Sequence, residues 1–468
     1  MTGVPVRGVL LACGGMTTDV GALPKTEKTS WGTVFVLALA TLIAASEISL
    51  SSFTLPLIGA EFEVSPGATA WVLLAYTLPS AALALPAGRW VDGADLRVVY
   101  LAGLAGIGVF SVLGVLAPNL PLLLAARVLL GLVSVGFMAC TMPALVRAVR
   151  PEERGRAMGW LMAVMTLGAT GAAPLGGWVA AEFGWRAVFL IKMPLLVVVA
   201  VAGARLLRRG DGRVPLPGRG LLGEGAVLGG AMTALVLSVE LVDVALVPAV
   251  VVLVVAVVLG VVWARLRASR PVVAVLRSAM AGLPALVLTL FAVSTGLTSF
   301  VLPYFVSDVM RADAGLLGTA VLCWVGVMSL VTPVAGGVVD RIGPLPVAAV
   351  GAALVGVAIL LHLPLGADAG LGDLAWRLAL LGLGAGLLNP AVSTAVLRSV
   401  PDEQAGVAGG LTNTARTVGL VLAPAVSAAA WSAGGFRGAI GLLAGVACAA
   451  FVVAAGAVVT GRRTRSSD

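Results

Sequence analysis

The chain has 468 residues, of which 60% are hydrophobic and only 11% are charged, and its mean hydropathy is +1.08. Because soluble domains carry about a quarter charged residues, this composition excludes a water-soluble fold and predicts an integral membrane protein. The net charge of +8 requires no nucleic-acid partner, since basic loops that face anionic membrane lipid account for it.

Apolar segments of roughly 20 residues recur along the chain, and each is long enough to cross a bilayer as a helix. Strands of a barrel would alternate polar and apolar residues, and these segments do not. Twelve membrane helices is the alternative count, because the seventh segment contains two glutamates and the eighth is mostly valine and leucine. We expect an all-α membrane protein with fourteen transmembrane helices, at about 32–57, 69–88, 98–117, 120–144, 156–181, 187–206, 221–241, 246–264, 280–306, 315–338, 345–363, 374–397, 404–430 and 436–460.

Glu47 lies inside the first of these segments, in a run that has no other charge between Lys28 and Glu61. A carboxylate in hydrocarbon is costly unless it is paired, hydrated or protonated, so its presence is a functional hypothesis. Arg127 of the fourth segment is expected at a similar depth and is its natural partner. A purely structural salt bridge between the two helices is the alternative interpretation.

A short internal repeat organises the chain. "GRWVDGADLR" at 88–97 follows the second expected helix and "GGVVDRIGPL" at 336–345 follows the tenth, and each has a glycine four residues before an aspartate. Such a repeat predicts two six-helix halves around a cavity near the membrane midplane, one half rocking on the other. We divide the chain into an N-terminal tail at 1–30, a first half at 31–206, a linker with two inserted helices at 207–279, a second half at 280–460 and a C-terminal tail at 461–468.

Basic residues fall mostly in alternate loops, such as 147–156, 205–219 and 265–277. The positive-inside rule then places these loops and both termini in the cytoplasm. Residues 1–30 lack an apolar core with a cleavage site, which predicts a cytoplasmic tail, whether Met1 or Met16 is the true start. The four cysteines are scattered and His362 is the single histidine, so we expect no metal site and no disulfide framework.

Four motifs make the chain resemble the major facilitator superfamily, and within it the branch of fourteen-helix drug:proton antiporters. "ASEISLSSFTLPLI" at 45–58 is similar to the first-helix motif of that branch, with Glu47 in place of the usual aspartate. "LLAARVLLGLVSVG" at 123–136 is similar to the fourth-helix motif, with Arg127 at its membrane-embedded arginine. The resemblance implies that Glu47 and Arg127 couple transport to protons.

The other two motifs resemble gating elements of the same family. The loop at 88–97 is similar to the motif between helices two and three and keeps Gly88, Asp92 and Arg97; Asp340 and Arg341 stand in its repeat. "GATGAAPLGGWVAAEFGWRAVFLIKMP" at 168–194 is similar to the fifth-helix antiporter motif, although Lys192 stands where an asparagine is common. Its small residues imply a hinge or seal between the halves, and close packing without a gating role is the alternative. They are Gly168, Gly171, Pro174, Gly176 and Gly177.

Neutral polar and aromatic residues of three helices are the candidates for a substrate cavity. They are Ser51, Thr54, Phe291, Thr295, Thr298, Tyr304, Asn389 and Ser393. Ser51 and Thr54 follow Glu47 at helical spacing, which predicts a polar stripe along a water-filled cavity. We expect Arg416, by contrast, to reach the cytoplasmic interface.

The resemblance implies a proton-coupled antiporter that exports hydrophobic or cationic small molecules, as in multidrug or antibiotic efflux, by alternating access. It is then not an enzyme and needs no cofactor besides the coupling proton. We expect a monomer that contacts membrane lipid in the bacterial cytoplasmic (inner) membrane. The alternatives are an exporter of one endogenous metabolite or lipid, a proton-coupled nutrient symporter, and a scaffold or sensor without transport activity.

Overall fold

The structure is a computed structural model whose regular elements, in the part of the chain that it describes, are all helical. It describes residues 29–465 apart from 92, 151–152, 154–155, 158–159, 162–163, 166, 208–209, 211, 216–217, 242–244, 267–268, 270–272, 274–278 and 400–404.

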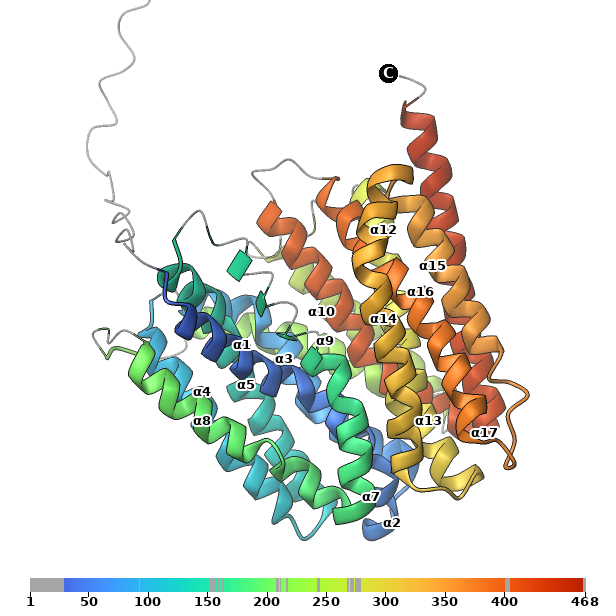
Figure 1. Ribbon diagram of the computed structural model, residues 1–468, viewed down its shortest axis with the longest axis horizontal. Coiled ribbons are helices and arrows are strands. Elements are labelled where there is room, and N and C mark those ends of the chain that lie inside the picture. The colour runs from blue at the N-terminus through green and yellow to red at the C-terminus, as the bar shows by residue number, and fades with distance from the viewer. Residues whose placement is uncertain are drawn as a thin grey trace, which may run out of the picture.

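The N-terminal part of the chain forms one group of helices (Figure 1). The helices are α1 (Trp31–Ser52), α2 (Leu55–Phe62), α3 (Pro66–Val91), α4 (Leu96–Val115), α5 (Leu120–Ala148), the π-helical turn η2 (Leu167–Gly171), α7 (Ala172–Leu190) and α8 (Met193–Leu206). Side chains cap several of their first turns, as the Asn119 carbonyl does for the N–H group of Leu122 at 3.0 Å, because the first N–H groups of a helix have no partner within it.

The first expected helix, 32–57, is two helices in the structure. α1 ends at Ser52 and α2 begins at Leu55, because Pro56 has no N–H group to donate to the carbonyl of Ser52, four residues before it. Thr54 therefore lies between α1 and α2, as the residue before the first turn of α2.

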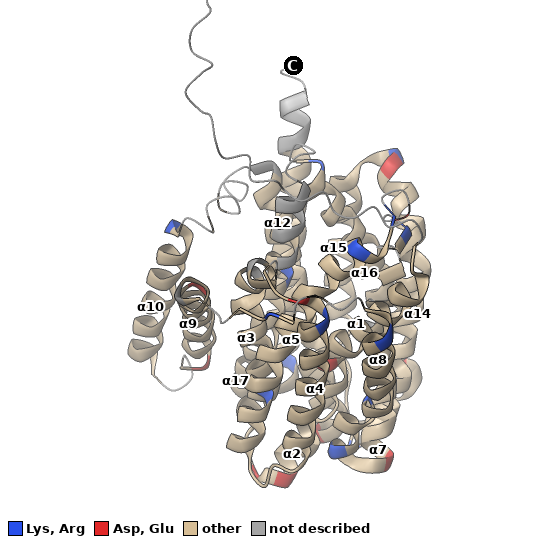
Figure 2. Ribbon diagram, turned by 90° about the vertical axis from the view of Figure 1, so that its left-hand side faces the viewer, with Lys and Arg blue, Asp and Glu red and all other residues tan. Residues whose placement is uncertain are grey.

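The inserted pair consists of α9 (Arg219–Leu241) and α10 (Leu246–Arg265). α9 packs against α3 and α17, and α10 packs against α9, so that the pair stands beside the rest of the molecule (Figure 2). α10 leaves most of its valines exposed, Val247 at 75%. A helix that is apolar on all sides and little covered by protein is suited to contact with lipid.

The C-terminal part forms the second group. It contains α12 (Ala279–Ser294), the π-helical turn η3 (Leu297–Val301), α13 (Leu302–Tyr304), the π-helical turn η4 (Phe305–Val309), α14 (Ala314–Ile342), α15 (Pro344–Leu360), α16 (Leu371–Leu397) and α17 (Ala405–Arg465). Its core includes the stacked rings of Phe305 and Phe436, whose centroids are 4.0 Å apart.

Eleven helical segments in the described residues are long and apolar enough to cross a membrane, and Pro344–Leu360 is a shorter apolar helix. Two of the eleven, 172–206 and 414–459, contain breaks. Gly184 has φ +75°, and Gly435 has φ +58°, a left-handed conformation that favours glycine. Fourteen crossings would require both segments to cross twice and the shorter helix to cross once, so the count of fourteen stays a prediction. α1 begins and α17 ends on the same side of the molecule (Figure 1), as an even number of crossings requires.

The two groups of helices touch where α7 crosses α14. A Cβ atom added to Gly177 would lie 2.6 Å from the carbonyl oxygen of Ala314, and one added to Gly318 would lie 2.8 Å from that of Pro174. Only residues without side chains allow the backbones to approach this closely. A hydrogen bond between the hydroxyl groups of Thr69 and Tyr304 joins the groups again, and these contacts close the space between them at the end where α2 lies.

Candidate transport site

A buried cluster of charges surrounds Glu47 on α1. Its carboxylate accepts a hydrogen bond at 3.0 Å from Nη1 of Arg127 on α5 and another from Nζ of Lys192, directly before α8. Glu47, Arg127 and Lys192 are 1%, 2% and 5% exposed. The structure thus brings together the two residues that the sequence pairs, and their role in proton coupling stays a prediction.

Arg127 is held at all three of its guanidinium nitrogens. Nη2 donates to the hydroxyl of Ser51 at 2.9 Å and Nε donates to the carbonyl of Val72 at 3.0 Å. The rings of Tyr76 and Phe189 lie 5.2 and 5.3 Å from the guanidinium carbon, within the range of cation–π attraction. These contacts orient the arginine toward Glu47.

Lys192 is the member of the cluster that the sequence analysis missed as a site residue. It is the only charged residue between Arg186 and Arg205, and that isolation within an apolar run was the available signal. With Lys192 present, two cations share one carboxylate. When all three groups are ionised, the cluster carries a net charge of +1 inside the membrane, which is costly in a medium of low dielectric constant.

A cavity of about 460 Å³ lies on the other face of α1 and is lined by helices of both groups. α1 contributes Ala45, Ile48, Ser49 and Ser52, which share one helix face through their three- and four-residue spacing. Glu47 belongs to a different face of α1. The charged cluster and the cavity are therefore separated by the body of a single helix.

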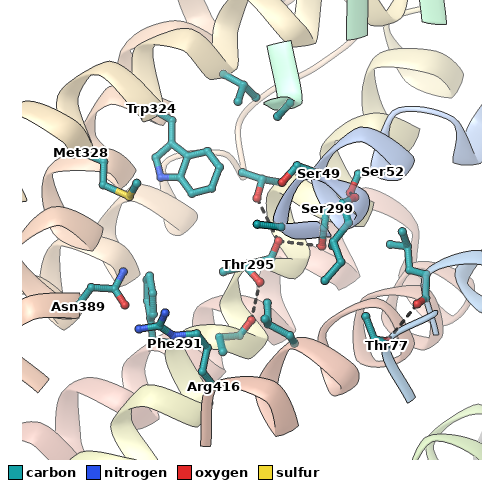
Figure 3. A pocket seen from close by; sticks show the side chains of 18 of the residues that line it. Ser49, Ser52, Thr77, Phe291, Thr295, Ser299, Trp324, Met328, Asn389 and Arg416 are labelled. Atoms are coloured by element: carbon teal, nitrogen blue, oxygen red, sulfur yellow. Dashed lines mark hydrogen bonds between the residues drawn. The ribbon is translucent and has the colours of Figure 1, made fainter. Parts of the chain in front are cut away.

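Five of the eight predicted cavity residues line this cavity: Phe291, Thr295, Thr298, Asn389 and Ser393. Figure 3 shows Phe291, Thr295 and Asn389 around it, together with Trp324 and Met328, which the sequence analysis did not select. Their contact with a substrate stays a prediction.

The other three candidates do not line the cavity. Ser51 is fully buried beside Arg127, the Thr54 hydroxyl donates to the carbonyl of Ser51 at 2.7 Å, and Tyr304 bonds Thr69. The polar stripe predicted on α1 is thus used for contacts inside the protein.

Arg416 lines the cavity, a position that the sequence did not predict, and its contact with the cytoplasmic interface stays a prediction. α17 begins at Ala405, so Arg416 lies about three helical turns inside this helix. It makes no hydrogen bond or ion pair with another residue that the structure describes. The indole N–H of Trp324 is also buried without a hydrogen-bond partner.

The predicted gating loop is only partly visible, since Asp92 lies outside the described residues. Gly88 is half-buried, and the Arg97 guanidinium donates to the carbonyl of Ala204. In the repeat, Asp340 forms an exposed ion pair with Arg398 at 3.1 Å, and Arg341 is exposed in the last turn of α14. A gating role for this loop stays a prediction.

Asp95 in the same loop was missed, and it joins the loop to the linker before α9. Its carboxylate accepts hydrogen bonds at 2.9 Å from the N–H groups of Arg97 and Gly212. Burial by itself raises the pKa of Asp95, but the hydrogen bonds from Gly212, Arg97, Val98 and Gly210 outweigh it and lower that pKa below its ordinary value. The carboxylate is therefore a stable anchor for the linker.

The small residues of the fifth-helix motif lie against two partners. A Cβ atom added to Gly168 would lie 2.6 Å from the carbonyl oxygen of Leu42, and one added to Gly176 would lie 3.2 Å from the Cα atom of Leu50. Leu42 and Leu50 are both on α1. Gly177 and Pro174 face α14, as described above, and Gly171 ends the π-helical turn before α7. The motif therefore lies between the two groups of helices, while its role as a hinge or seal stays a prediction.

Comparisons with known proteins extend these observations. The multidrug efflux pump LfrA of Mycolicibacterium smegmatis is 34% identical over 208 residues, which span 43% of this chain and 41% of LfrA. The puromycin resistance protein pur8 of Streptomyces alboniger is 31% identical across 85% of this chain and 80% of its own. The tetracenomycin C resistance and export protein of Streptomyces glaucescens is 28% identical across 85% of this chain and 75% of its own.

Solved structures show the same fold at low identity. A POT family transporter in complex with 5-aminolevulinic acid is 15% identical with a TM-score of 0.67, over 92% of this chain and 96% of that one. The family model described as Major Facilitator Superfamily matches residues 37–277 and 284–468. The chain therefore belongs to the Major Facilitator Superfamily.

Proposed function

We propose that the protein is a proton-coupled exporter of hydrophobic small molecules in the bacterial cytoplasmic membrane, with both termini in the cytoplasm. The superfamily consists of transporters rather than enzymes. The names of the relatives, an efflux pump, an export protein and a resistance protein, support outward transport. The bacterial efflux and export relatives and the apolar helices support a location in the cytoplasmic membrane. We propose further that the protein acts as a monomer.

One observation carries the proposal: α1 has the buried charges on one face and the cavity on another. A proton that joins or leaves the cluster of Glu47, Arg127 and Lys192 changes how strongly α1 is held to α5 and α8. Because the same helix contributes Ser49 and Ser52 to the cavity, its displacement alters the cavity directly. Proton and substrate then exchange through the movement of α1, without competing for one binding site.

The energy for export comes from the proton. A proton that moves inward down a membrane potential gains about 2.3 kcal/mol per 100 mV. This gain drives substrate outward only if the carrier cannot reorient when it is both empty and unprotonated. The bonds of ionised Glu47 with Arg127 and Lys192 provide such a barrier, because moving α1 away from α5 and α8 would leave buried charges without their partners.

The test is export against a substrate gradient by vesicles that contain the purified full-length protein. Glu47→Gln should abolish export driven by a proton gradient and the proton release that substrate induces, while the protein still folds. Glu47→Asp should retain part of the activity, because the titrating group survives. Glu182→Gln, an exposed acid on α7, is the control and should behave as the parent.

Two results would contradict the proposal. If Glu47→Gln exports uphill and releases protons like the parent, Glu47 is structural and the coupling mechanism is wrong. If cells that overproduce the protein accumulate a broad panel of dyes and antibiotics as control cells do, the exporter of one endogenous metabolite or lipid becomes the better interpretation.

A further inference from the structure

The cavity has one charged side chain in the part of its lining that the structure describes. Among the described residues that line it, Arg416 is the only charged residue, and no carboxylate faces it. Figure 3 shows the Arg416 side chain entering the cavity on the side where Phe291 and Asn389 lie. A guanidinium in such a place, without a counter-ion from the described part of the protein, is an unfavourable arrangement unless something else supplies the negative charge.

Most hydroxyl groups around the cavity already donate a hydrogen bond to a backbone carbonyl of the protein. Ser52 donates to the carbonyl of Ile48 at 2.8 Å, Thr77 to that of Leu73 at 3.0 Å and Thr332 to that of Met328 at 2.7 Å. Trp324 still offers its indole N–H, which is buried and has no partner, and Arg416 offers its whole guanidinium. The strongest unsatisfied groups of the cavity are thus hydrogen-bond donors, and one of them is a cation.

We propose that the cavity takes aromatic organic anions, whose carboxylate or phenolate oxygens pair with Arg416 and accept from Trp324. The aromatic body lies among the apolar and aromatic side chains of Phe291, Trp324 and Met328. A volume of about 460 Å³ is typical of sites for small molecules. The same unpaired cation repels lipophilic cations, which have no carboxylate to bind here. This inference rests on the exporter function proposed above and names its substrate class.

The experiment compares three probes that share a naphthalene ring and differ in charge: 2-naphthoate, neutral 2-naphthamide and (2-naphthylmethyl)trimethylammonium. Binding to the purified full-length protein is measured by titration calorimetry. The parent should bind naphthoate about tenfold or more tighter than the ammonium probe, since charge-assisted hydrogen bonds in a desolvated site contribute that much.

Variants assign this preference to the donors. Arg416→Gln should weaken naphthoate binding by about tenfold or more and leave naphthamide binding nearly unchanged, whereas Arg416→Lys should keep the preference for the anion. Trp324→Phe, which keeps a ring but removes the N–H, should weaken naphthoate binding several-fold. Arg398→Gln removes an arginine outside the cavity that pairs with Asp340 and should change none of the three affinities.

Two results would overturn the inference: equal binding of the ammonium probe and naphthoate by the parent, or an unchanged anion preference in Arg416→Gln. Uphill export of naphthoate by vesicles is measured alongside, because it tests the exporter function separately. A parent that prefers the anion in binding but does not export it contradicts the proposed function alone, and a parent that exports the ammonium probe equally well contradicts this inference alone.

Discussion

Arg127, which is buried, and Arg416, which is half-buried, are arginines in opposite groups of helices, and their surroundings differ. Each guanidinium nitrogen of Arg127 donates to a group of the protein: Glu47, Ser51 and the Val72 carbonyl. Arg416 faces a cavity and makes no hydrogen bond or ion pair with another described residue. A charge that the fold fully satisfies holds helices together, whereas a charge that the fold leaves unsatisfied is available to a molecule that enters from outside.

The largest expected effect separates the two arginines by stability. Arg127→Met should lower the free energy of unfolding by about 3–5 kcal/mol, because it removes the buried hydrogen bonds of a cation to Glu47, Ser51 and the Val72 carbonyl. Arg416→Met should leave that free energy unchanged or raise it, since it removes a cation that has no partner in the described structure. Thermal unfolding of both variants in detergent measures the difference, and equal losses would erase the distinction.

Charge balance around Arg127 gives the next effect. Glu47→Gln leaves two buried cations without an anion, and we expect it to cost about 1–3 kcal/mol of stability. Lys192→Met leaves Glu47 and Arg127 as a neutral pair and should cost less. The double variant Glu47→Gln with Lys192→Met should therefore be more stable than Glu47→Gln alone, a non-additivity expected of residues in contact. Simple addition of the two effects in thermal unfolding would show that the charges do not interact.

The contact between the two groups of helices can be tested where α7 crosses α14. Gly318→Ala would place a Cβ 2.8 Å from the Pro174 carbonyl oxygen, and such overpacking costs about 1–3 kcal/mol. We expect export rates in vesicles to fall several-fold. Gly326→Ala is the matched control, because it lies on the same helix and its added Cβ would meet nothing within 4 Å. Equal export by both variants would argue against a seal at this crossing.

Asp95 extends the comparison to a charge that backbone groups satisfy. Because its pKa is lowered in the folded protein, its contribution to stability is complete above the ordinary value of 3.8 and is lost as the pH falls through the folded value. Asp95→Asn keeps a good helix cap, so we expect a loss under about 1 kcal/mol at pH 7. This loss should disappear in strongly acidic solution. Unfolding curves at the two pH values measure it, and a loss that persists in acid would exclude the charge as its cause.

The smallest effect is expected in the inserted pair. Glu240 on α9 accepts a hydrogen bond from the Trp71 indole at 3.1 Å, far from the cluster around Glu47 in the chain and outside the residues that line the cavity. Glu240→Gln should leave proton-driven export at the level of the parent, since an amide oxygen still accepts this bond. Loss of uphill export in this variant would assign coupling to the inserted helices.

The sequence predicts a good part of this architecture, because apolar segments of membrane length and loop charges are local signals. It also identifies Glu47 and Arg127, since an ionised group inside an apolar run stands out against its neighbours. Cavity residues are harder to predict, because a helix in a bundle has protein on more than one side and spacing alone does not say which side is hollow. Ser51 illustrates this: it shares a helix face with Glu47, but its hydroxyl accepts a hydrogen bond from Arg127 and does not line the cavity.

Arg416 and Lys192 show a second limit. Both are cationic residues in apolar segments. Their chemistry depends on how deep they lie in the membrane and on partners that are distant in the chain. Arg416 was expected at an interface because long cationic side chains usually reach one. Lys192 was noted only as a departure from a motif, because its bond with Glu47 spans 145 residues of sequence.

The position of α9 has a mechanical consequence. On the side of α3 its backbone fits closely, since Cβ atoms added to Gly225 and Gly229 would collide with or press on side chains of α3. Toward α17 the contact consists of side chains in one apolar cluster, among them Val421 and Ala425. If one group of helices rotates against the other, the interlocked side must travel with α3 while the α17 side undergoes shear. Spin labels on α9 should therefore keep their distance to labels on α3 and change their distance to labels on α17 during the transport cycle. The inserted pair would then move as one body with the N-terminal group and slide along the C-terminal group.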